Sequence, residues 1–170
     1  MAYIVDSIGI LSSSVFYGEV TPRQQEAYAQ NYGFILYSKT VYVSSYSNIS
    51  PVTASVYIMQ VRDRAHVFID GICQGVVYRA NPTNTTITTP GNGFFVLSIL
   101  VENMGRINYG HAMNDPKGIV GDGVYVDGKL QTGNWTVNTL PLEYSQLQLL
   151  QYAVLNPKLV EQNIGPIFMR

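Results

Sequence analysis

The stretch that decides the fold is FFVLSILV, residues 94–101. It is almost continuously apolar, and the turn residues Pro90, Gly91 and Gly93 stand just before it. The run is short for a helix, and its aromatic and β-branched side chains favour an extended strand. We therefore expect a buried strand at 94–101, with the other strands arranged around it.

Further β-rich runs lie on both sides of this strand and are separated by turn residues. Asp70-Gly71 stands between two of them, which is a strong signal for a β-hairpin. Many short strands spaced by turns are typical of an antiparallel β-sandwich or jelly roll, so we predict an all-β domain. The other expected strands are 3–11, 34–43, 52–61, 65–70, 75–79, 85–89, 118–126 and 135–142.

Helical signals are few. Thr21 has the character of an N-cap and Pro22 suits the first helical position, so a short helix is predicted over 22–30. A second short helix is expected near 146–155, where Leu and Gln dominate and Pro157 follows.

Composition excludes several classes of function. The 170 residues carry a formal net charge of −1 and only 12% charged side chains, so nothing attracts nucleic acid or an anionic membrane surface. No apolar run approaches the ~20 residues that cross a bilayer. Residues 1–10 lack the pattern of a signal peptide. A single cysteine, Cys73, rules out a disulfide within the chain.

Three blocks of sequence carry a family resemblance. They read QNYGFILYSKTV (30–41), DRAHVFIDGICQGVVYR (63–79) and VENMGRINYGHAMNDPKGI (101–119). In this order and spacing they resemble the first β-domain of the family 35 glycoside hydrolases, the β-galactosidases. GNWTVNTLPL (133–142) and GPIFMR (165–170) fit the same family, although Met169 stands where an aromatic residue is usual.

The resemblance implies an antiparallel sandwich of jelly-roll, galactose-binding-like type over 1–145. Residues 146–170 would then be a C-terminal extension or a linker toward a following β-domain. In the family this sandwich follows a TIM-barrel catalytic domain that holds the catalytic glutamates. The barrel is outside the resemblance, so no catalytic residue is carried over to this chain.

The function expected first is a non-catalytic accessory domain that packs against the barrel or a neighbouring β-domain, so its partners would be protein domains or subunits. Two alternatives stay open. In the first, the chain is a stand-alone module that binds galactosides. In the second, it is a structural assembly subunit that keeps the fold but has lost the enzymatic activity. The compartment also stays open, although the family resemblance implies a secretory or lysosomal location.

Catalytic and metal sites are not indicated, and we expect no cofactor. The eleven acidic residues are scattered, whereas a retaining glycosidase needs two carboxyl groups about 5 Å apart. Asp70, Asp122 and Asp127 each precede a glycine and are interpreted as turn residues. The two histidines and one cysteine, which do not have metal-ligand spacing, are His66, His111 and Cys73.

Glu102 is interpreted as structural because it ends an apolar strand, where an unpaired charge would be costly. Arg106 is its expected partner, with Lys117 as the second choice. Three N-X-S/T sequons also occur, and Asn84 and Asn134 are the candidate glycosylation sites. Pro51 weakens the third sequon, at Asn48.

Sugar contact, if the chain binds galactosides, is expected at loop 103–117 and at the only tryptophan. Sugar rings stack on aromatic faces, and amide or guanidinium groups bind their hydroxyls. The alternative is that the loop braces its own backbone and that the tryptophan packs in the core or at a domain interface. The candidate contact residues are Asn103, Arg106, Asn108, Tyr109, Asn114 and Trp135.

Overall fold

The computed structural model describes residues 11–45, 51–80, 84–121 and 123–145. Strands dominate these ranges; within them the helical residues are two 3-10 turns, Leu11 and residues 144–145. In chain order the elements are β1 (Ser14–Glu19), η1 (Gln25–Tyr28), β2 (Phe34–Val43), β3 (Val52–Ile58), β4 (Val61–Arg62), β5 (Arg64–Ile69), β6 (Ile72–Tyr78), β7 (Thr85–Thr89), β8 (Gly93–Glu102), η2 (Gly110–Met113), β9 (Gly118–Ile119), β10 (Val124–Val126), β11 (Lys129–Leu130) and β12 (Trp135–Leu140).

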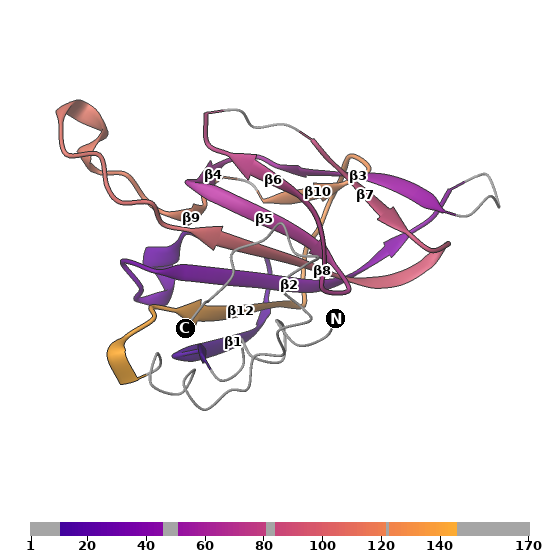
Figure 1. The fold of residues 1–170 in the computed structure, drawn as a ribbon, viewed down its shortest axis with the longest axis horizontal. Coiled ribbons are helices and arrows are strands. Elements are labelled where there is room, and N and C mark those ends of the chain that lie inside the picture. The colour runs from indigo at the N-terminus through magenta and orange to yellow at the C-terminus, as the bar shows by residue number, and fades with distance from the viewer. Residues whose placement is uncertain (1–10, 46–50, 81–83, 122, 146–170) are drawn as a thin grey trace, which may run out of the picture.

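The strands form antiparallel sheets, as the sequence predicts. A six-stranded sheet has the order β1-β12-β2-β8-β5-β6, a four-stranded sheet has the order β11-β10-β3-β7, and β4 pairs with β9 (Figure 1). Ile35, Val67 and Ile99 of the larger sheet belong to the same buried cluster as Val56 and Ile87 of the smaller one. The two sheets therefore pack face to face, and the predicted β-sandwich is confirmed.

The predicted hairpin at Asp70-Gly71 is confirmed. Ile69 pairs with Ile72, and the two turn residues have φ angles of 47° and 77°. Two consecutive positive φ angles are the geometry of a type I′ turn, whose twist matches that of the flanking strands. Asp127-Gly128 repeats this device between β10 and β11.

The helix predicted over 22–30 is wrong in extent. Only Gln25–Tyr28 is helical, as a 3-10 turn, and Gln24 rather than Thr21 precedes it. The Gln25 N–H donates to the backbone oxygen of Lys117 at 2.6 Å, and the Gln25 side chain donates to the backbone oxygen of Tyr32 at 2.8 Å. A helix that began at Pro22 would need the Gln25 N–H for its own backbone hydrogen bonds, but this N–H bonds to Lys117 instead. Long-range hydrogen bonds thus override the local capping signal.

Strand boundaries also differ. Residues 12–21, which look irregular in sequence, contain β1, and Gly18 lies where its register with β12 shifts. Such a shift is a β-bulge, so the glycine bends an edge strand instead of ending it. The runs predicted at 52–61 and 118–126 are each divided, because β4 and β9 leave the neighbouring strands to pair with each other. The predicted strand 3–11 lies outside the described residues except for Leu11, which is helical instead of extended. The predicted helix 146–155 and Asp122 also lie outside them.

The central predicted strand, β8, is buried only in its second half. Leu97 to Val101 are buried, whereas Phe94 is 75% exposed. Over the described ranges, no helix has the length and apolar character needed to cross a membrane.

Candidate functional site

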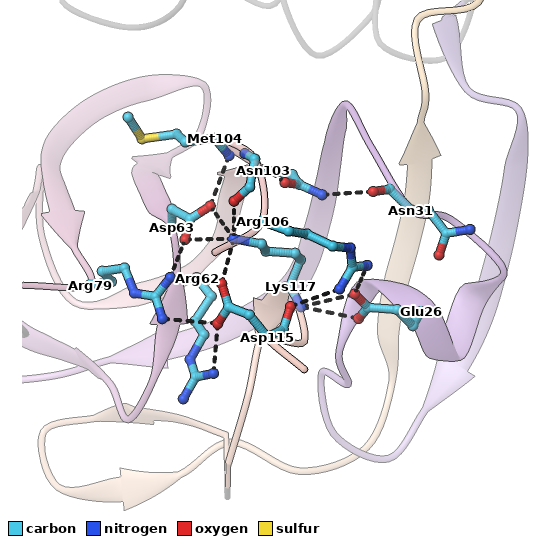
Figure 2. A network of polar contacts seen from close by, with 11 residues as sticks. Glu26, Asn31, Arg62, Asp63, Arg79, Asn103, Met104, Arg106, Asp115 and Lys117 are labelled. Atoms are coloured by element: carbon cyan, nitrogen blue, oxygen red, sulfur yellow. Dashed lines mark hydrogen bonds and ion pairs between the residues drawn. The ribbon is translucent and has the colours of Figure 1, made fainter. Parts of the chain in front are cut away.

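Loop 103–117 connects β8 to β9 and extends away from the sheets at one end of the sandwich (Figure 1). The 3-10 turn η2 lies within it. Under the base of the loop, charged side chains from distant parts of the chain meet in a buried group (Figure 2). We call the group formed by Arg62, Asp63, Arg79, Asp115 and Lys117 the ion network.

Lys117 lies at the centre of the ion network and its side chain is completely buried. Its Nζ donates to both carboxylate oxygens of Asp63, at 2.9 and 2.7 Å, and lies 2.8 Å from Oδ2 of Asp115. It also donates to the backbone oxygen of Gly105 at 2.5 Å. A buried ammonium with every proton directed at an oxygen is stable as a charge only because these partners surround it.

Asp115 is the second buried carboxylate of the network. Arg79 donates to both of its oxygens at 2.9 Å, and Arg62 Nη1 donates to Oδ1 at the same distance. The bidentate Arg79 contact, reinforced by Lys117, holds the pKa of Asp115 well below its ordinary value, although burial opposes the shift. Asp115 therefore stays ionised in acid.

Asp63 connects the network to the start of the loop. It lies between β4 and β5, and its Oδ1 accepts from Arg79 at 2.8 Å. Its Oδ2 accepts from the backbone N–H of Met104, also at 2.8 Å. Met104, two residues after the end of β8, is thus tied to the beginning of β5.

Glu26 of η1 holds the far end of the loop from outside the network. Its carboxylate accepts from the backbone N–H of Lys117 at 3.0 Å and from Arg106 Nη2 at 2.5 Å. Arg106 also donates to the backbone oxygen of Asp115 at 2.9 Å. Both arms of the loop are consequently tied at their base, and Arg106 crosses between them.

Asn103, a predicted sugar contact, is occupied by its own chain. Its side-chain amide donates to the backbone oxygen of Asn31 at 2.9 Å, and its carbonyl oxygen accepts from the N–H of Gly105 at 3.0 Å. Arg106 is occupied as described above. Of the predicted loop contacts, Asn108, Tyr109 and Asn114 have exposed side chains.

The chemistry of the ion network is structural. Asp63 and Asp115 share one lysine, but both carboxylates are buried and bound to cations on several sides. A general acid must hold a proton near neutral pH, and the cations around Asp115 oppose protonation. Within the ranges that the structure describes, no group of three or more His, Cys, Asp or Glu side chains is arranged to hold a metal ion.

The tip of the loop has the opposite character to its base. Tyr109 is 86% exposed, and Met104, Ile107 and Met113 are exposed as well. Large apolar side chains that cluster on one projecting loop indicate a contact surface rather than scattered surface residues. We call Ile107, Tyr109 and Met113 the loop tip; Met104 lies at the base, where its N–H contacts Asp63.

The expected partners of Glu102 are corrected by the structure. Glu102 forms an ion pair with Arg64, which lies opposite it on the neighbouring strand β5. Arg106 pairs with Glu26 instead, and Lys117 with Asp63 and Asp115. Sequence proximity suggested Arg106, but β-pairing brings residues 38 positions apart side by side.

Trp135 is not available as a platform for sugar. Its ring is fully buried, its Nε1–H donates to the backbone oxygen of Gln131 at 2.9 Å, and Lys39 Nζ lies 6.0 Å from the ring centroid. Asn84 and Asn134, the candidate glycosylation sites, are both exposed. Glycosylation at either one stays a prediction.

Most of the ion network was missed by sequence reasoning. Arg62, Asp63, Arg79 and Asp115 gave no motif, because the ion pairs among these four residues join positions 16 to 53 residues apart along the chain. A weak signal was present: in a chain with only 12% charged residues, Arg62-Asp63-Arg64 concentrates three charges at the start of a strand. That pattern indicates paired charges but not their partners.

Comparison with known proteins agrees with the fold. Residues 22–143 match the family model described as "Beta-galactosidase, first all-beta domain". This range contains all the charged residues of the ion network and the whole of loop 103–117.

Curated relatives give the same result. The chain is 35% identical to mouse β-galactosidase over 140 residues, which cover 82% of the chain and 21% of the relative. It is 41% identical to human β-galactosidase over 114 residues, which cover 67% and 16%. It is 36% identical to a β-galactosidase of Xanthomonas manihotis over 123 residues, which cover 72% and 19%. The chain therefore spans about a fifth of the length of these relatives.

Proposed function

The chain belongs to the family of first all-β domains of β-galactosidases, and from that premise we propose that it is an accessory domain that docks onto a neighbouring domain through its loop tip. The observation that carries the proposal is the contrast within loop 103–117. Its base is held by buried ion pairs, whereas its tip exposes Ile107, Tyr109 and Met113.

The rigid base supports a docking role because binding by a pre-ordered loop avoids most of the entropy that a flexible loop loses. Each arm of the loop is tied at its base: Gly105 to Lys117, and Asp115 to Arg62 and Arg79. Aromatic and Met side chains are enriched at protein interfaces. Tyr109 contributes a large apolar ring and a hydroxyl that can find a partner in the interface.

A photo-crosslinking experiment tests the proposal on the full natural polypeptide that carries this chain. Tyr109 is replaced with p-benzoylphenylalanine, the sample is irradiated, and the cross-linked peptides are identified by mass spectrometry. We expect cross-links from position 109 to peptides outside residues 1–170. Tyr17, which is 77% exposed on edge strand β1, receives the same replacement as a matched control and is expected to give none.

The alternatives predict different results. A galactoside-binding module would show NMR shifts at Asn108, Tyr109 and Asn114 on titration with galactose or lactose, and no cross-links to another domain. An assembly subunit would give cross-links from position 109 to a second copy of this chain. A natural polypeptide that consists of this chain alone and stays monomeric would contradict the docking proposal.

A further inference from the structure

Arg62 uses only part of its guanidinium within the ion network. It lies on β4, which pairs with β9 where loop 103–117 returns to the sandwich. Its Nη1 donates to Oδ1 of Asp115 at 2.9 Å. In the part of the chain that the structure describes, its Nε and Nη2 have no hydrogen-bond partner, and neither is a buried atom. Two charged donors of Arg62 are therefore open to solvent.

The open donors form the edge that other arginines of this chain use to bind carboxylates. Arg64 donates through Nε and Nη2 to Oε2 of Glu102, and Arg23 donates through the same two atoms to Oε2 of Glu19. The planar guanidinium fixes these two N–H groups in an orientation that matches a carboxylate. We call Nε and Nη2 of Arg62 the open fork.

The opposite edge of the guanidinium holds the open fork in place. Asp115, which accepts from Nη1, is buried and is also bound to Arg79 and Lys117. Figure 2 shows Arg62 at the margin of the ion network, joined to it through Asp115. A side chain that is already held loses less conformational entropy when it binds a partner. The open fork is thus ordered in advance.

Charges around the open fork favour an anionic partner. Five cations and four carboxylates meet at the base of the loop, and the cations are half of the ten Lys and Arg residues in the chain. The arginine side chains are 28–38% exposed, whereas the carboxylate side chains are 1–23% exposed. A partner that approaches this end therefore meets guanidinium groups first. The cations are Arg62, Arg64, Arg79, Arg106 and Lys117, and the carboxylates are Glu26, Asp63, Glu102 and Asp115.

The open fork also lies close to the loop tip. Asp115, its anchor, follows Met113 of the loop tip by two residues. Figure 1 shows β4 and β9 at the point where the loop leaves the sandwich. Protein interfaces have an apolar centre and a polar rim. The loop tip can supply the apolar part of one interface and Arg62 a charged part of its rim.

We propose that the open fork of Arg62 binds the carboxylate of an Asp or Glu side chain on the neighbouring domain. This inference rests on the proposed docking of the loop tip, and it adds the chemistry of the partner surface. A free anion at an exposed arginine gains little, because water screens the contact. Docking excludes water from the fork, so a carboxylate carried by the partner domain is bound more strongly than an ion in solution.

Carbodiimide coupling on the full natural polypeptide tests the proposal, because the reagent joins an amine to a carboxylate that is in contact with it. Arg62→Lys supplies the amine and keeps a positive charge beside Asp115. We expect an isopeptide bond from position 62 to an Asp or Glu outside residues 1–170, identified by mass spectrometry. Coupling to Asp115 gives a different peptide and is counted separately.

Arg23→Lys is the matched control. It makes the same substitution at an exposed arginine whose Nε and Nη2 are already bound to Glu19. It is expected to couple only to carboxylates within residues 1–170. Circular dichroism checks that both variants keep the β-structure of the parent.

A second measurement does not depend on the lysine variants. Sulfate stabilises proteins in general, so its effect on Tm is compared between the parent polypeptide and Arg62→Gln at matched ionic strength. If a partner carboxylate fills the open fork, sulfate has no site there. We therefore expect the same shift of Tm in both proteins.

The outcomes separate this inference from the docking proposal. Cross-links from position 109, with no coupling from position 62 beyond the chain, would leave the docking in place and overturn the acidic contact. No reaction at either position would overturn both. Coupling from position 62 alone would support the acidic contact and overturn docking through the loop tip.

Two further results would assign the open fork to another partner and overturn the inference. Coupling from position 62 to a second copy of this chain would indicate self-association. A larger effect of sulfate on the parent than on Arg62→Gln would show that the fork is open in the natural polypeptide and takes a free anion.

Discussion

Lys117 Nζ contacts both carboxylate oxygens of Asp63, at 2.9 and 2.7 Å. Both side chains are buried, so solvent does not screen the ion pair. The contact joins the end of loop 103–117 to the beginning of β5, 54 residues earlier in the chain. The same ammonium lies 2.8 Å from Asp115. One buried lysine therefore bridges two carboxylates and determines where the loop returns to the sandwich.

Replacing Lys117 with methionine is expected to destabilise the domain strongly. Met fills a similar volume but leaves Asp63 and Asp115 with their arginines alone, and breaking one partner of a buried ion pair costs about 3–5 kcal/mol. Urea unfolding of the two proteins measures the difference. Lys129→Met on β11, where the lysine is exposed, is the control and should change the unfolding free energy by less than about 0.5 kcal/mol. Equal effects would contradict a buried structural role.

Asp115 predicts a steep dependence of stability on acid. Arg79 and Lys117 hold its pKa below the ordinary value of 3.8, so below about pH 4 the unfolded chain binds a proton that the folded chain resists. The stability that Asp115 contributes is fully present at pH values above its ordinary pKa, and it is lost as the pH falls through its lowered pKa. Asp115→Asn should therefore be less stable than the parent at pH 7 and should show a flatter loss below pH 4. Chemical unfolding at a series of pH values measures both, and parallel curves would contradict the assignment.

The fold was predictable from sequence where local signals and long-range pairing agree. Residues 94–101 mark β8 because they are apolar, and Asp70-Gly71 marks the β5–β6 hairpin because only certain residues accept its two positive φ angles. The helix predicted at 22–30 failed because Gln25 and Glu26 form bonds to distant residues. Capping signals describe a segment in isolation and contain no information about such partners.

The site was predictable only in part, for the same reason. Loop 103–117 was identified by its glycines and polar side chains, and its tip is exposed. The partners of Glu102 and Lys117 depend on which strands are neighbours, and the register of β5 against β8 selects Arg64. Trp135 was considered for sugar binding because it is the only tryptophan, but its position on β12 directs the ring into the core.

His66 predicts a second pH dependence, at milder acidity. Its pKa is lowered from 6.5, mainly by burial, so the folded chain resists a proton that the unfolded chain accepts. The associated stability is complete above 6.5 and decreases as the pH falls toward the lowered value. His66→Leu removes both this loss and the two ring nitrogens, which are buried without a hydrogen-bond partner among the described residues. We expect a gain of about 1 kcal/mol at pH 7 and a flatter profile between about pH 6.5 and 5. Urea unfolding at pH 7 and between about pH 6.5 and 5 provides the measurement. A variant that is less stable than the parent throughout this range would contradict the unpaired state of His66.

Gly118 provides a test of how tightly the loop returns to the sandwich. It has a φ of +89°, and a Cβ there would lie 2.5 Å from the Tyr37 hydroxyl and 3.0 Å from the backbone nitrogen of Gln25. The Tyr37 hydroxyl is buried, donates to the backbone oxygen of Arg23 at 2.7 Å and accepts from the Ile119 N–H at 3.3 Å. A methyl group would displace it from both partners.

Gly118→Ala is therefore expected to combine two costs. The left-handed backbone costs an alanine about 1–2 kcal/mol, and the broken hydrogen bonds of a buried hydroxyl add about 1–3 kcal/mol. Gly128→Ala isolates the first cost, because Gly128 has a φ of +73° and no atom within 4 Å of the added Cβ. Urea unfolding should show that the Gly118 variant is less stable than the Gly128 variant. The difference should equal the cost of the broken hydrogen bonds of the Tyr37 hydroxyl. If the two variants lose the same free energy, the contact between Gly118 and Tyr37 is not close packed, and the loop is anchored by its ion pairs alone.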